Sequence, residues 1–240
     1  TAMTLQHVLI AVSACVAFVA CDTPPSEVAE RVVPGSKPYE FSTVDDNIQN
    51  DTLLTQTTFD LGDSTFIMVA SNVVETFEGL RLYRYRFTAD STVERIATSS
   101  PGYDSWTMLP TFFALDSVRP TDALWVLANF GEKESWGQKL MILDWEFTDH
   151  GFLDVALPER VQEGDSSLLK RRNVAPYMRY CESGDTAVFL FACDSVYLYD
   201  DQAGGMDQVV AAERLRFTFH RDEGLALWLD GHKRPVKKPS

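Results

Sequence analysis

The chain carries one short apolar or alternating segment after another, separated by turn-forming residues, and this pattern limits it to a fold built of β-strands. Residues 66–70, 124–128 and 187–191 are apolar at nearly every position, which is typical of strands that are covered on both faces. Residues 215–219 and 225–229 alternate between apolar and other residues, as half-buried strands do. No stretch has a convincing helical period, so the fold class is all-β.

The same succession of strands recurs three times, at intervals of about 60 residues. The first copy comprises Phe59 and residues 66–70, 80–87 and 93–97. The second comprises residues 112–115, 124–130, 140–147 and 152–157. The third comprises residues 177–181, 187–193, 196–199 and 215–219, with 225–229 after it. We therefore predict an antiparallel meander with blade-like repeated units, as in an irregular or incomplete propeller; a two-sheet β-sandwich is the alternative.

The start of the chain differs in character from the rest. Residues 8–20 form an apolar run that is too short for a transmembrane helix, which needs about 20 residues. The run ends in Phe18-Val19-Ala20-Cys21, and the sequence becomes polar immediately afterwards. An apolar run of this length that ends in small residues is typical of a secretory signal.

This ending resembles the lipobox of bacterial lipoproteins, in which a large apolar residue and two small residues precede an obligatory cysteine. The resemblance implies cleavage before Cys21, a thioether-linked diacylglycerol on its sulfur, and attachment to a membrane of the bacterial cell envelope. The chain is also similar in style to uncharacterised β-rich envelope lipoproteins of Bacteroidota-like bacteria, which implies a location and no activity. An ordinary cleaved signal peptide and a buried apolar segment are the alternatives.

These features divide the chain into four parts. Residues 1–20 are the predicted signal peptide, and residues 21–42, which are rich in proline, are a lipidated tether. Residues 43–230 form the all-β domain. Residues 231–240 are a basic tail, which we expect to be solvated.

Charge and cysteine content narrow the function further. The formal net charge of −14 lies wholly after residue 20, and so acidic a chain is not expected to bind nucleic acid. Cys181 and Cys193 would remain in an oxidising compartment, where a disulfide is permitted. In a hairpin that turns near residues 183–185, however, Cys181 would face Val188, which places Cys193 too far away. We therefore expect two buried free thiols.

No catalytic or metal-binding motif is present in the sequence, and no cofactor is predicted. Aromatic residues provide the candidate ligand surface. Phe130 and Trp136 bracket the charged loop 129–137, and Tyr83 and Tyr85 share one face of residues 81–87 with Arg81 and Phe87. Packing of these rings in the core is the alternative. On the other face Arg84 and Arg86 are expected to lie on the solvated side.

Asp144 and Glu146 are two residues apart on an expected strand, and Asp154 could lie beside them on the next. Two carboxylates at a fixed separation would suit a glycosidase, but in so acidic a chain a solvated strand face is the default interpretation. The sequence therefore favours a non-enzymatic binding or structural module of the cell envelope, with a glycan or protein as ligand. A glycan-acting hydrolase and an envelope inhibitor or accessory subunit are the alternatives.

Overall fold

The computed structural model describes residues 39–45, 48, 52–73, 79–101, 105–115, 124–132, 139–199 and 207–236. These residues contain eighteen β-strands and no α-helix; two single turns of 3₁₀-helix, η1 (Ala175–Tyr177) and η2 (Ala212–Arg214), complete the secondary structure. The predicted all-β class is confirmed.

The strands form four antiparallel sheets. Sheet 1 comprises β1 (Ser42–Val44), β2 (Leu53–Gly62), β3 (Thr65–Asn72), β4 (Leu80–Phe87) and β5 (Val93–Thr98), in that order. Sheet 2 comprises β6 (Ser105–Ala114), β7 (Leu124–Glu132), β8 (Lys139–Leu143) and β9 (Asp149–Leu153), also in chain order. Each of these sheets is a meander, because every strand pairs with the one that follows it.

Sheets 3 and 4 are interleaved along the chain. Sheet 3 comprises β12 (Met178–Ser183), β13 (Thr186–Phe191), β16 (Leu215–His220), β17 (Gly224–Leu229) and β18 (His232–Pro235). Sheet 4 comprises β11 (Ser166–Arg172), β10 (Val155–Glu163), β14 (Ser195–Leu198) and β15 (Gln208–Ala211). The chain therefore leaves sheet 3 after β13, adds two strands to sheet 4, and returns.

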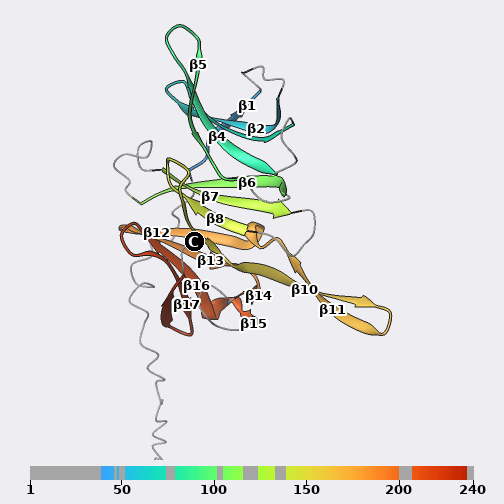
Figure 1. Cartoon of the computed structure of the whole chain (residues 1–240). Coiled ribbons are helices and arrows are strands. Elements are labelled where there is room, and N and C mark those ends of the chain that lie inside the picture. The colour runs from blue at the N-terminus through green and yellow to red at the C-terminus, as the bar shows by residue number, and fades with distance from the viewer. Residues whose placement is uncertain are drawn as a thin grey trace, which may run out of the picture.

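Sheets 1, 2 and 3 are stacked, with sheet 2 in the middle (Figure 1). Strand β7 shows why this arrangement buries so much apolar surface. Leu124, Val126 and Ala128 enter the core against sheet 1, whereas Trp125 and Leu127 enter the core against sheet 3. The prediction that residues 124–128 are covered on both faces is confirmed.

A polar contact also joins sheet 2 and sheet 3. The hydroxyl group of Tyr180 on β12 donates a hydrogen bond to the carbonyl oxygen of Ala114, 3.2 Å away. The same hydroxyl oxygen lies 2.8 Å from the Glu182 carboxylate. Burial, followed by the contact with Glu182, raises the pKa of this phenol. Tyr180 is therefore a neutral donor that fixes sheet 3 against sheet 2.

The repeat prediction is right for the first two copies in outline and wrong for the third. Residues 196–199 were expected in the same sheet as β13, but β14 pairs with β10 and β15, and β16 takes the place beside β13. Residues 152–157 are two strands in different sheets, β9 and β10. The hairpin of β10 and β11 was not predicted, because β11 has no regular alternation.

The described domain extends beyond the predicted limits of 43 and 230. Tyr39 donates its backbone N–H to the Phe112 carbonyl oxygen at 2.8 Å, and Phe41 packs edge-on against the Phe112 ring at 5.0 Å. At the other end the predicted basic tail contributes β18, which pairs with β17. Both segments belong to the fold because they cover sheet surface that would otherwise be open.

Candidate functional site

The candidate site lies on the outer face of sheet 1, the face that is turned away from sheet 2. Alternation along β3 and β4 produces it: Ile67 and Leu82 point toward sheet 2, whereas Met68, Tyr83 and Tyr85 point outward. The outward residues form a small cluster of their own, against which Ile48, Leu53, Phe66 and Phe87 pack. Sheet 1, at one end of the stack, thus has an apolar surface on each of its two faces.

Aromatic contacts fix the shape of this surface. Phe66 and Tyr85 are direct partners across β3 and β4, and their rings stack with centroids 5.4 Å apart. Phe87 meets both rings edge-on, at 5.7 Å from Phe66 and 6.1 Å from Tyr85. Offset-stacked and edge-on pairs of this kind are favourable beyond the area that they bury. The rings therefore form a rigid floor.

A half-open pocket of about 250 Å³ lies beside these rings, and of the three only Tyr85 lines it. Leu53, Met68, Tyr83 and Tyr85 line it from the sheet, and Ile48 and Thr52 line it from the connection between β1 and β2. Its volume is just below the range of pockets for drug-sized ligands, so it suits a single ring or the end of a longer molecule.

The lining of the pocket also contains polar residues. Asn72, Arg81, Arg95 and Thr98 line it, and none of the described lining residues is acidic. Arg81 lies on β4 and contacts the Ser99 carbonyl oxygen at 3.5 Å, whereas Arg95 is exposed on the edge strand β5, opposite Tyr85. The hydroxyl of Thr98 is buried and has no hydrogen-bond partner among the described residues. The described lining of the pocket thus includes two arginines and two tyrosines, with a buried threonine hydroxyl beside them.

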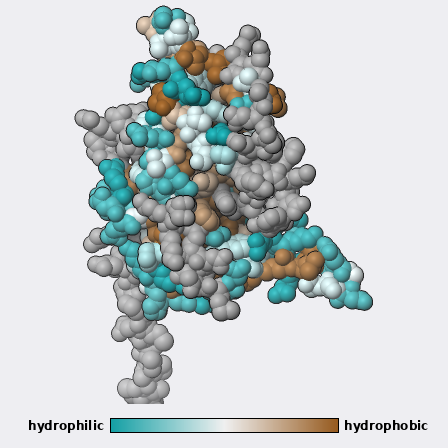
Figure 2. Space-filling model, in the orientation of Figure 1, coloured by the Kyte–Doolittle hydropathy of each residue, from teal (hydrophilic) through white to brown (hydrophobic). Residues whose placement is uncertain are grey.

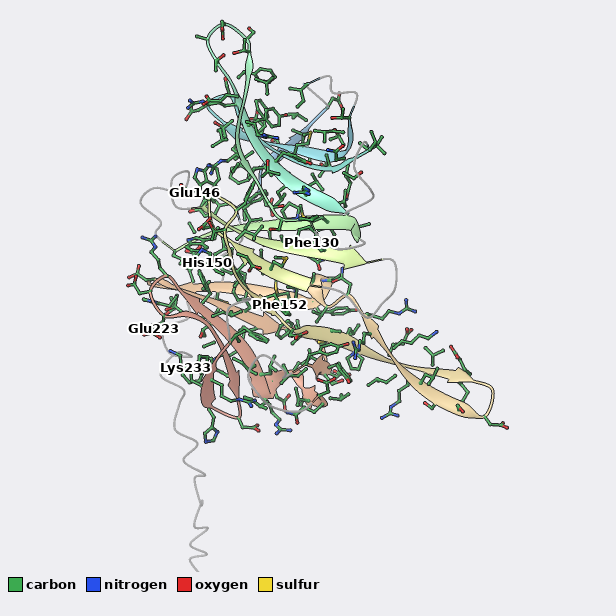
Figure 3. The ribbon with its side chains drawn as sticks, in the orientation of Figure 1. Phe130, Glu146, His150, Phe152, Glu223 and Lys233 are labelled. Atoms are coloured by element: carbon green, nitrogen blue, oxygen red, sulfur yellow. The ribbon has the colours of Figure 1, made fainter. Side chains whose placement is uncertain are left out.

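Some of the residues predicted to form a ligand surface line the pocket, and others do not. Tyr83 and Tyr85 share a face with Arg81, as predicted, and all three line the pocket. Phe130 was expected on an exposed loop, but it lies within β7, is 2% exposed and packs in the core between sheets 1 and 2 (Figure 3). Trp136 and Cys21 lie outside the described residues.

The strand β7 extends to Glu132, past the position at which the charged loop 129–137 was predicted to begin. A Cβ atom at Gly131 would collide with the hydroxyl of Thr107 on the neighbouring strand. The glycine therefore leaves room for the Thr107 side chain within a continuous sheet. The strand continues through Gly131, and Phe130 keeps its inward orientation.

The sequence-based prediction for the side chain of Arg84 is wrong. It was expected on the solvated side, but it is only 4% exposed. Its guanidinium stacks on the Trp145 ring at 4.1 Å from the centroid and donates a hydrogen bond to the Trp145 carbonyl oxygen. Burial lowers its pKa, while the nearby charges of Glu146 and Asp144 oppose that shift. Arg84 thus joins sheet 1 to the turn between β8 and β9.

The acidic residues near Arg84 form a turn and no catalytic pair. The predicted strand 140–147 ends at Leu143, and the Asp144 Oδ1 atom accepts hydrogen bonds of 2.9 Å from the backbone N–H groups of Glu146 and Thr148. Asp144 Oδ2 lies 2.9 Å from Nε2 of His150, on the same side of the stack as Glu146 (Figure 3). An aspartate that holds a turn in this way is a common structural device.

The pKa of Asp144 reflects this role. Burial alone would raise it, but the hydrogen bonds from His150, Thr148 and Glu146 lower it below the ordinary value for aspartate. His150 in turn packs edge-on against Trp125 at 4.8 Å and near Phe219 at 5.9 Å. Asp144 therefore uses its carboxylate oxygens to hold the turn and His150.

The two cysteines and the metal ligands can be described briefly. Cys181 faces Val188, as predicted, and Cys181 and Cys193 are both free thiols whose pKa values are raised by burial. Within the described ranges, no three His, Cys, Asp or Glu side chains are grouped so that they could hold a metal ion. In the same ranges no helix has the length and apolarity to cross a membrane.

Comparison with known proteins gives no match. The chain matches no protein-family model, and neither a curated protein nor a solved structure resembles it significantly.

Proposed function

We propose that this protein is a lipid-anchored binding protein of the bacterial cell envelope, and that the pocket on the outer face of sheet 1 binds an acidic sugar. The address rests on the sequence: a charge-free leader ends at Cys21, and a proline-rich segment separates that cysteine from the β domain. Lipid on Cys21 would hold the protein at a membrane, because two or more acyl chains anchor stably whereas one binds only weakly.

The observation that carries the ligand class is the charge of the pocket. The chain has a net charge of −14, yet two arginines, Arg81 and Arg95, are among the described residues that line the pocket, and none of these lining residues is acidic. Guanidinium groups bind carboxylates and similar anions through charge-assisted hydrogen bonds. From these two arginines in the lining we infer that the ligand carries an anionic group.

The remaining lining residues favour a sugar as the carrier of that anion. Asn72, Thr52 and Thr98 contribute polar side chains to the lining, as expected for a site that binds a ligand with hydroxyl groups. Tyr83 and Tyr85 provide an apolar surface with a polar edge, which suits the mixed character of a sugar ring. The described lining holds neither a carboxylate nor an imidazole, so it supports binding rather than hydrolysis.

Substitution of Arg95 tests the pocket. Calorimetric titration of the wild-type protein with a uronic-acid disaccharide should give saturable binding, and Arg95→Gln should weaken it about tenfold or more, because a charge-assisted hydrogen bond contributes about 1.5–3 kcal/mol. Arg221→Gln, which removes an exposed arginine from the turn between β16 and β17, should leave binding unchanged. The same titration with a neutral disaccharide is the control for the ligand. If the neutral disaccharide bound as tightly as the uronic-acid disaccharide, or if the two substitutions weakened binding equally, the proposed ligand class would be contradicted.

Substitution of Cys21 tests the anchor separately. When the chain is produced in a bacterium with its leader, the wild type should sediment with membranes, and Cys21→Ser should move to the soluble fraction or remain as an uncleaved precursor. Cys15→Ser is the matched control, because Cys15 lies inside the leader and should not affect anchoring. Mature Cys21→Ser protein that stays on washed membranes would rule out the lipid anchor and leave the pocket untouched.

A further inference from the structure

A two-stranded arm leaves the body of the molecule where sheet 4 ends. Strand β14 pairs with β10 only at Val155 and Ala156, whereas β10 and β11 continue as a pair from Leu157 to the turn at Gly164. Among the described residues nothing else pairs with this part of either strand. The arm projects away from the stack, as Figure 1 shows.

The arm exposes apolar side chains and an unpaired backbone edge. Leu168 is 45% and Leu169 is 37% exposed, and a hydrophobic patch is visible on the arm in Figure 2. A two-stranded hairpin by itself is marginally stable in water, and an open strand edge is a template for another strand. The arm therefore presents the features of a surface that pairs with a further strand.

Ion pairs fix the register within the arm. Lys170 lies 3.1 Å from Glu163, and Arg172 lies 2.5 Å from Glu159, each reaching diagonally across β10 and β11. All four charges lie on the same face as the cross-strand pair Val161 and Leu168. Because these pairs hold the two strands in a defined alignment, the outer edge of β11 has a defined pattern as well.

We propose that this edge pairs with a second copy of the same chain, β11 against β11 in antiparallel orientation, with the two-fold axis at Leu169. A two-fold axis perpendicular to a sheet keeps each face on its own side, so the pairing has to be centred on a residue rather than between two. Leu169 is the middle residue of β11 (Ser166–Arg172), and only this centre brings the whole strand into register with its copy.

The charge pattern agrees with this centre. Leu169 meets Leu169, Lys170 meets Leu168, Arg171 meets Ser167 and Arg172 meets Ser166, so no like charges oppose each other. A centre at Lys170 would instead place two ammonium groups opposite each other. With the axis at Leu169, the basic end of one β11 also lies beside the acidic turn of the other copy, which carries Glu163 and Asp165.

Charge exchange at the axis tests the pairing and its register together. Sedimentation velocity of the unlipidated Cys21→Ser chain over a wide concentration range should show a reversible dimer. Leu169→Glu and Leu169→Lys should each raise the dissociation constant about tenfold or more, since each places like charges opposite each other at the axis. An equimolar mixture of the two variants should recover a dimer, because the opposite charges then meet.

The control is Leu54→Glu, a substitution of a side chain that is 64% exposed on β2, far from the arm in the sheet order; it should leave the dimer intact. A wild-type chain that is monomeric at every concentration would overturn the proposal and leave the arm to a different partner. Loss of the dimer in both single variants without recovery in the mixture would equally overturn it, because the axis would then lie elsewhere.

Discussion

Phe113→Ala is expected to reduce the free energy of unfolding by about 3–5 kcal/mol, the range measured for truncation of a buried aromatic side chain. Phe113 is fully buried between sheets 2 and 3. Its ring lies 5.4 Å from that of Tyr180, 5.6 Å from that of Phe189 and 6.4 Å from that of Trp125. Alanine would leave a cavity at the meeting point of two sheets, which rigid strands cannot close.

Urea denaturation followed by circular dichroism measures this loss. Leu109→Ala is the matched control, because Leu109 lies on the same strand β6 but is 58% exposed. Its effect should stay within about 0.5 kcal/mol, as for most surface substitutions. Comparable losses in the two variants would show that sheets 2 and 3 do not pack through Phe113.

Arg84→Ala is expected to reduce the free energy of unfolding by about 2–4 kcal/mol, because it removes a buried guanidinium from its stack on Trp145 and leaves a partly buried carbonyl group without its donor. The Arg84 guanidinium covers the Trp145 ring and donates to the Trp145 carbonyl oxygen, and it lies near the charges of Asp144 and Glu146. All of these contacts connect sheet 1 to the turn that follows β8.

The adjacent arginine on the same face provides the control. Arg86 is half-exposed and pairs with Glu94 at 2.6 Å, and an exposed ion pair contributes about 0–1 kcal/mol. Arg86→Ala should therefore have a small effect in the same thermal or urea unfolding experiment. If Arg84→Ala were no more destabilising than Arg86→Ala, the buried stack would not stabilise the contact between the sheets.

The parts of the fold that could be predicted are those in which local sequence decides the structure. Residues 124–128 are apolar at every position, and such a segment is stable only where both faces are covered. The alternation of residues 81–87 likewise placed Tyr83 and Tyr85 on one face with Arg81, and these residues line the candidate pocket. Period and composition are sufficient for predictions of this kind.

The parts that could not be predicted depend on residues that are distant in the chain. Arg84 is buried because Trp145, 61 residues later, covers it, and nothing in the sequence of β4 indicates that contact. The strand β14 has the same alternation as a strand of sheet 3, and its place in sheet 4 is decided by pairing with β10. The basic residues of β18 resemble a solvated tail until their pairing with β17 is known.

The detour of the chain through sheet 4 has a consequence for the order in which the protein can fold. Sheets 1 and 2 pair strands that follow one another, so each needs only short loops to close and can form before the rest of the chain is available. Sheet 3 cannot pair β13 with β16 until residues 192–214 are also available, and closing that longer loop costs additional chain entropy. The core between sheets 2 and 3 is therefore the last to be completed, after the anchored end of the chain has already reached the membrane surface under the proposed topology.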